Sequence, residues 1–125
     1  MKAESSMPDT PQLLVDAQWK TSTVALRCAG VVDMLTELDL RQQIDNALDR
    51  SPSAVIVDLT LVDFISSRGL RVLLDTHKRC SPDVDFAVVA DGHATLRPMR
   101  LTGLTDILSV RSRVDDALAD VTAPR

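Results

Sequence analysis

Residues 54–70, AVIVDLTLVDFISSRGL, decide how this chain folds. The stretch opens on a continuous apolar run over 54–57, which is typical of a strand that is buried on both faces of a parallel sheet. We predict a loop over 60–70 that leads directly into a helix, because Leu70, Leu73 and Leu74 have helical spacing. A buried strand followed by an amphipathic helix is the repeating unit of α/β proteins.

The rest of the chain alternates between strand and helix patterns. Apolar residues recur at every second position over 13–19 and 24–28, which predicts a hairpin whose second strand ends at Gly30. The later elements are predicted as a helix capped by Asp33 or Thr36 and broken at 51–53, a strand at 86–90, a helix at 95–101 with Pro98 in its first turn and Gly103 at its end, a strand at 107–108, and a helix from Ser112 to Val121. This order predicts an α/β fold with a mixed, mostly parallel sheet and crossover helices.

The composition suits one small domain. The chain has 125 residues, of which 45% are hydrophobic, enough for a single core. We expect a domain over 12–121, with a flexible tail over 1–11 and a short tail over 122–125, because neither end continues the apolar pattern. We also expect a cytoplasmic protein without membrane insertion, since the sequence contains neither a secretory signal nor a long apolar run.

Several classes of function are disfavoured. A formal net charge of −4 and an aromatic content of 2% argue against nucleic acid as a partner. Asp58 and Asp63 have no histidine or nucleophile near them in the sequence, so we predict that the protein is not an enzyme. No cluster of metal ligands and no phosphate-binding glycine loop is present, so neither a metal nor a cofactor is expected.

The two cysteines carry different expectations. Cys28 points inward by the strand alternation and is expected to act as a small core residue. Cys80 ends a predicted helix beside Lys78 and Arg79, whose charges lower a thiol pKa, so a redox role stays open for it.

Ser66 and Ser67 fall where the helix after the central strand begins. A serine at this position usually caps the helix by accepting a hydrogen bond from a free backbone N–H group. The same helix end also favours a negative charge, so an exposed serine there is suited to carry a phosphate. The residue chemistry alone leaves both interpretations open.

Residues 57–70 resemble the signature of STAS domains, a family that includes bacterial anti-sigma factor antagonists. The segments 30–33 (GVVD) and 101–104 (LTGL) resemble two further motifs of the family, and the likeness covers roughly residues 12–120. The resemblance implies a STAS-like domain that acts as a switch by binding an anti-sigma factor and releasing a sigma factor for transcription. The implied partner is a serine kinase of the histidine-kinase-like ATPase type.

The resemblance also implies the site residues. Ser67 matches the phosphorylated serine of the family, with Ser66 as an alternative acceptor in the place of the usual aspartate. Arg68 stands where the family has a small residue, and two interpretations stay open for it. Its side chain either pairs with a phosphate or a partner carboxylate, or it is an ordinary solvated helix residue. The implied partner surface consists of Asp33, Asp63, Phe64, Ser66, Ser67, Arg68, Gly69, Arg71 and Asp75. A second interpretation is a STAS accessory subunit of a membrane transporter complex, such as one for lipids.

Overall fold

The computed structural model describes residues 12–122, and the predicted tails at 1–11 and 123–125 lie outside the described residues. Thr122, which was assigned to the second tail, is the last residue of a helix. The elements in chain order are β2 (Leu13–Lys20), β3 (Thr23–Val32), α1 (Glu37–Leu48), β4 (Ala54–Ile65), α2 (Ser67–Cys80), β5 (Asp85–Val89), α3 (Leu96–Leu101), the 3₁₀ helix η1 (Leu104–Asp106), β6 (Ser109–Arg111) and α4 (Val114–Thr122).

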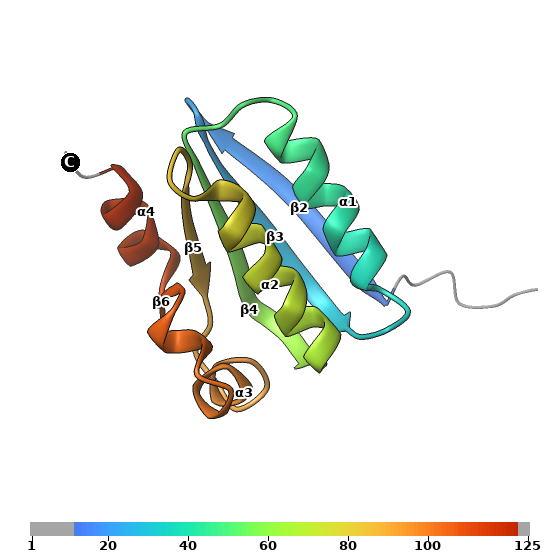
Figure 1. Ribbon diagram of the computed structural model, residues 1–125. Helices are drawn as coiled ribbons and strands as arrows, with labels where there is room; N and C mark the ends of the chain where they lie inside the picture. The colour runs from blue at the N-terminus through green and yellow to red at the C-terminus, as the bar shows by residue number, and fades with distance from the viewer. Residues whose placement is uncertain (1–11, 123–125) are drawn as a thin grey trace, which may run out of the picture.

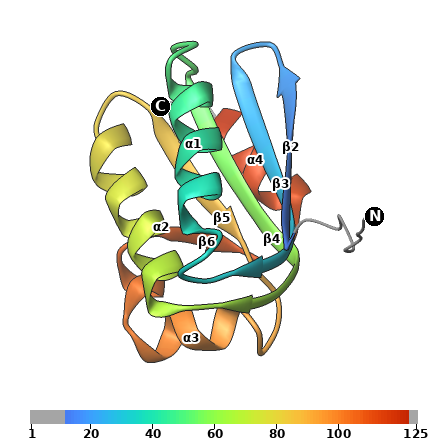
Figure 2. The ribbon, with the colours of Figure 1, turned by 90° about the vertical axis from the view of Figure 1, so that its right-hand side faces the viewer.

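The strands form one five-stranded sheet in the order β2-β3-β4-β5-β6 (Figure 1). β2 runs antiparallel to β3, whereas the pairs β3–β4, β4–β5 and β5–β6 are all parallel. Helices α1 and α2 cover one face of this sheet and α4 lies on the other (Figures 1 and 2). The predicted α/β class and the mixed, mostly parallel sheet are therefore confirmed.

The core is divided unequally between the two faces. The larger cluster lies under α1 and α2, and it includes Leu26 of β3, Leu40 of α1 and Leu73 of α2, each with no exposed surface. The smaller cluster packs α4 against β4 and β5 through Ala117, Ile56 and few other buried residues. Most of the apolar free energy of folding therefore comes from the α1 and α2 side of the sheet.

The central strands are longer than predicted. β3 passes through Gly30 to Val32, and β4 continues to Ile65, so the loop predicted over 60–70 is wrong. Two β-bulges explain the difference, because the β3–β4 register shifts twice and the apolar alternation of β4 is interrupted at each shift. After the second shift Val32 pairs with Ile65, and both side chains are buried.

The C-terminal part confirms one prediction and corrects two. α3 spans nearly the predicted residues, and Gly103 follows it with a φ of 80°. The predicted strand at 107–108 is wrong, because the backbone N–H of Leu108 donates to the carbonyl of Leu104 and closes a turn; the strand begins at Ser109 instead. The predicted start of the last helix at Ser112 is also wrong, since α4 starts at Val114 and the backbone N–H of Ala117 donates to the carbonyl of Arg113.

We predict that Gly30→Ala lowers the free energy of unfolding by about 2–3 kcal/mol. Gly30 has a φ of +118°, and an added Cβ would lie 2.1 Å from the carbonyl oxygen of Gln12. Urea denaturation followed by circular dichroism measures the change. Gly92→Ala is the matched control, because nothing lies within 4 Å of its added Cβ, and we expect a change within about 0.5 kcal/mol there. Equal stability of the two variants would contradict the prediction.

Candidate functional site

The carboxyl ends of β3 and β4 bring the starts of α1 and α2 together. The backbone N–H of Ser66 donates to the carbonyl oxygen of Val32 at 2.8 Å, so the two strands are still joined where the helices begin. Parallel strands place the loops that follow them at one edge of the sheet, which is where α/β folds bind ligands and partners. This edge contains most of the site residues suggested by the sequence.

The loop from β3 to α1 is shaped by Asp33 and Thr36. The Oδ1 atom of Asp33 accepts hydrogen bonds from the backbone N–H groups of Leu35 at 2.8 Å and Thr36 at 3.2 Å. The hydroxyl of Thr36 donates to the carbonyl of Val31 at 2.7 Å and accepts from the N–H of Asp33 at 2.9 Å. Asp33 therefore holds the loop in shape, and the N-cap of α1 is Thr36, whose side chain makes no capping hydrogen bond.

An exposed apolar patch, formed by Met34, Leu35 and Leu38, lies at the start of α1. These side chains are 65%, 71% and 70% exposed, respectively. They are not among the residues that the sequence pattern suggested for the site. The signal was that Met34 and Leu35 precede α1 and that Leu38 lies off its buried stripe, which contains Leu40 and Ile44.

Ser66 and Ser67 have different environments at the start of α2. Ser66 is the N-cap, and its hydroxyl oxygen accepts a hydrogen bond from the N–H of Gly69 at 3.2 Å. Ser67 is the first helical residue and is exposed, and within residues 12–122 its hydroxyl makes no hydrogen bond. The structure thus separates the capping serine from a serine whose hydroxyl is accessible.

Gly69 lies beneath this surface and is buried. A Cβ at this position would come within 2.6 Å of Ile65 Cγ1 and 2.7 Å of Val32 Cγ1. The absence of a side chain therefore lets α2 begin directly against the ends of β3 and β4. Gly69 was predicted as a contact residue. Because it is buried against Ile65 and Val32, it positions the start of α2 beneath the exposed residues.

A chain of ion pairs links the two helices. Arg68 Nη1 of α2 lies 3.0 Å from Glu37 Oε1 of α1, so Arg68 is neither a free cation nor simply solvated. The carboxylate of Asp75 in α2 forms ion pairs with Arg41 Nη2 of α1 and with Arg71 Nε of its own helix, each at 3.0 Å. The hydrogen bond from Arg41 is the main cause that lowers the pKa of Asp75. These contacts fix the relative positions of the two helix starts more than they stabilise the fold, because exposed ion pairs contribute about 0–1 kcal/mol each.

Phe64 lies apart from Ser67. Phe64 pairs with Val31, and its neighbour Ile65 is buried under α1 and α2, so Phe64 points to the opposite face of the sheet and is 52% exposed there. Asp63 is the extra residue at the second register shift and is exposed. The structure therefore does not bring Phe64 into one surface with Ser67.

Both cysteines are buried, which changes the expectation for Cys80. Cys28 has no exposed surface, and burial, with a smaller effect of the Asp58 charge, raises the pKa of its thiol to about 12. Cys80 is 2% exposed, and burial raises its pKa despite the opposing effect of Arg79. The expected lowering of the Cys80 pKa is therefore wrong, because loss of solvation outweighs the nearby positive charge.

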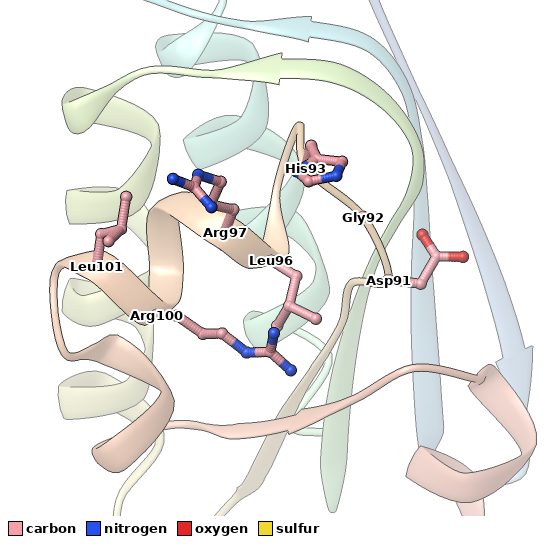
Figure 3. A pocket seen from close by; sticks show the side chains of 7 residues that line it. All are labelled: Asp91, Gly92, His93, Leu96, Arg97, Arg100 and Leu101. Carbon is pink, nitrogen blue, oxygen red and sulfur yellow. The ribbon is translucent and has the colours of Figure 1, made fainter.

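A pocket of about 330 Å³ lies beside α3, away from Ser67 (Figure 3). Figure 3 shows Arg97 and Arg100 on opposite sides of the α3 ribbon, and Asp91 pointing away from both. Its charged groups therefore do not converge on one point. Within residues 12–122 no three His, Cys, Asp or Glu side chains are grouped as a metal site, and no helix in that range is long and apolar enough to cross a membrane.

Comparison with known proteins gives related sequences and structures. The STAS domain family matches residues 15–117. The anti-sigma-F factor antagonist RsfB of Mycobacterium tuberculosis is 32% identical over 120 residues, which is 96% of this chain and 97% of RsfB. The crystal structure of an anti-sigma factor antagonist from Mycobacterium paratuberculosis has a TM-score of 0.86 at 34% identity, covering 94% and 99% of the two chains. The phosphorylated form of the Bacillus cell fate determinant SpoIIAA shares the fold, with a TM-score of 0.63 at 17% identity over 86% and 99% of the chains.

We predict that neither Cys28 nor Cys80 reacts with the thiol reagent DTNB in the native protein at pH 8. Both thiols are buried and their pKa values are raised, so neither thiolate is present or accessible. The absorbance of the released thiolate measures the reaction, and unfolding in urea is expected to expose both groups. Fast labelling of Cys80 in the folded protein, identified with the Cys28→Ala variant, would contradict this result.

Proposed function

The chain belongs to the STAS domain family, and from this premise we propose that it acts as an anti-sigma factor antagonist. It binds an anti-sigma factor and so releases the sigma factor which that protein holds. RsfB and the Mycobacterium paratuberculosis protein, both similar to this chain over nearly its whole length, carry this function in their names. These names support the antagonist interpretation over the transporter subunit, for which no comparable support exists.

The observation that carries the proposal is an exposed hydroxyl at the start of α2, which an ion pair joins to the start of α1, where the exposed apolar patch lies. Ser67 begins α2, and its neighbour Arg68 is bonded to Glu37 at the start of α1. Leu38, part of the exposed apolar patch, directly follows Glu37 in the chain. A partner that spans the starts of both helices would therefore meet the patch and Ser67 together. Apolar surface of this kind, with polar groups around it, marks protein interaction sites.

Phosphorylation of Ser67 gives this surface a switch. A phosphate brings a charge of about −1.5 to −2, which opposes burial in an apolar interface through its solvation. The Ser66 hydroxyl already accepts the N–H of Gly69, so the accessible Ser67 hydroxyl is the acceptor we propose. The negative charge also suits the first turn of α2, so the switch requires no change of fold.

The partner that fits this switch is an anti-sigma factor which is itself the kinase. A kinase of the histidine-kinase-like ATPase type that binds the α1 and α2 edge would have the Ser67 hydroxyl within reach of its nucleotide. Addition of the phosphate would then end the complex that made the reaction possible. This part of the proposal rests on the family resemblance at residues 57–70 together with the exposure of Ser67.

We predict that Ser67→Glu weakens binding of the anti-sigma factor at least tenfold, about 1.4 kcal/mol. The partner is first captured from bacterial extract with the wild-type chain and identified by mass spectrometry, and calorimetry then measures the dissociation constants. Ser67→Ala is expected to bind as the wild type does and to resist phosphorylation by that partner. Ser112→Glu, at another exposed serine, is the matched control for added charge. Wild-type affinity of Ser67→Glu would exclude the switch.

We further predict that Leu35→Asp weakens the same complex at least tenfold while the thermal unfolding of the protein stays close to that of the wild type. Leu35 is 71% exposed, so a carboxylate there costs little in the free protein but must lose its solvation in the complex. Ile107→Asp, at a residue that is 52% exposed at the end of η1, is the control and should bind normally. If both variants bind as tightly as the wild type, the patch is not the contact surface.

A further inference from the structure

The sheet face that carries α4 is only half covered. α4 packs against β4, β5 and β6, where Ile56, Ala87 and Val89 are buried beneath it. β2 and β3 lie at the other side of the sheet, and no described helix crosses their surface on this face (Figures 1 and 2). On this face Ala25 of β3 packs against the cluster under α4, Ala29 and Val31 are half-buried, and Leu14, Asp16 and Arg27 are exposed.

Apolar side chains are grouped on this open face. Leu14 of β2 pairs with Ala29 of β3, which pairs with Leu61 of β4, so the three residues form one row across three strands. Val31 and Phe64 form the next row. We call these five residues the open-face strip. Leu14, Leu61 and Phe64 are 57%, 51% and 52% exposed, although large apolar residues in a sheet are normally covered.

The row next to the strip carries opposite charges on neighbouring strands. Asp16 of β2 pairs with Arg27 of β3, and both side chains are exposed. Arg27 makes no ion pair with any residue in the range 12–122, and the only hydrogen bond of the Asp16 carboxylate comes from Gln18. A second copy of this surface, turned by 180° against the first, would place its Asp16 opposite Arg27 and its Arg27 opposite Asp16. The two surfaces are therefore complementary in charge as well as apolar.

We propose that the open-face strip binds a second copy of this chain in a twofold symmetric dimer. In such an interface each residue i contacts residue j of the other copy, and the reverse contact forms as well. The strip of one protomer covers the strip of the other, and Arg27 pairs with Asp16 of the partner subunit. The dimer leaves Ser67 and the exposed apolar patch accessible, because they lie by α1 and α2, so the proposal does not depend on the proposed function.

Sedimentation equilibrium of the full chain, from about 5 µM to about 500 µM, tests the proposal, because interfaces of few residues dissociate in the micromolar range. The mass is expected to rise from 13.6 kDa toward twice that value. Leu61→Asp is expected to raise the dissociation constant at least tenfold, and Ile107→Asp, at a similarly exposed apolar residue outside the strip, should leave it unchanged. A monomer at every concentration, or a dimer that Leu61→Asp does not weaken, overturns the proposal.

Exchanging the charges of Arg27 and Asp16 tests whether a second copy of the chain binds the open-face strip. Arg27→Asp alone and Asp16→Arg alone are each expected to weaken the dimer at least threefold, because each places like charges opposite one another. The double variant carrying both substitutions should regain wild-type affinity, since the pair is restored in reverse. Far-UV circular dichroism of all three variants confirms that the fold is retained. A double variant no tighter than the single variants overturns the pairing of Arg27 with Asp16 of the partner subunit.

Discussion

The close contact of Gly69 with Ile65 and Val32 is the constraint on which the candidate site depends. An added Cβ at Gly69 would lie 2.6 Å from Ile65 Cγ1, so only glycine allows α2 to start this close to the sheet. In the same region the backbone N–H of Ser66 donates to the carbonyl of Val32, so β3 and β4 stay hydrogen-bonded to each other up to their ends. As a consequence α1 and α2 begin side by side, and the ion pair of Arg68 with Glu37 bridges the two helix starts.

The two serines show how one helix start serves both stability and regulation. Ser66 caps α2, an interaction that contributes about 1 kcal/mol in typical helices. The Ser67 hydroxyl makes no hydrogen bond within the described range, so its modification would not cost the helix its cap. A phosphate at this end of α2 would meet the favourable end of the helix dipole, and its effect would fall on the partner rather than on the fold.

The unequal coverage of the sheet gives the protein two separate surfaces. The α1 and α2 side holds the larger core, and its edge displays the exposed apolar patch together with Ser67. The α4 side has a small core and leaves the open-face strip uncovered. Because the two surfaces lie on opposite faces of the sheet, contact at one does not block the other.

Local pattern was enough to predict the types of most elements and the start of α2. The continuous apolar run over 54–57 is a buried strand, and Ser66 and Ser67 do stand at the helix start, because burial on both faces and helix capping act over a few neighbouring residues. The true lengths of β3 and β4 were missed, since β-bulges interrupt the alternation by which a strand is recognised.

Tertiary contacts decided the rest of the site. The burial of Cys80, the pairing of Arg68 with Glu37 and the exposure of Leu35 each depend on elements that are distant in the sequence. A pattern shows which residue types a segment contains and at what spacing. Solvation and partners are set only when the helices pack on the sheet, which is why the pKa of Cys80 and the free hydroxyl of Ser67 could be assigned only from the three-dimensional structure.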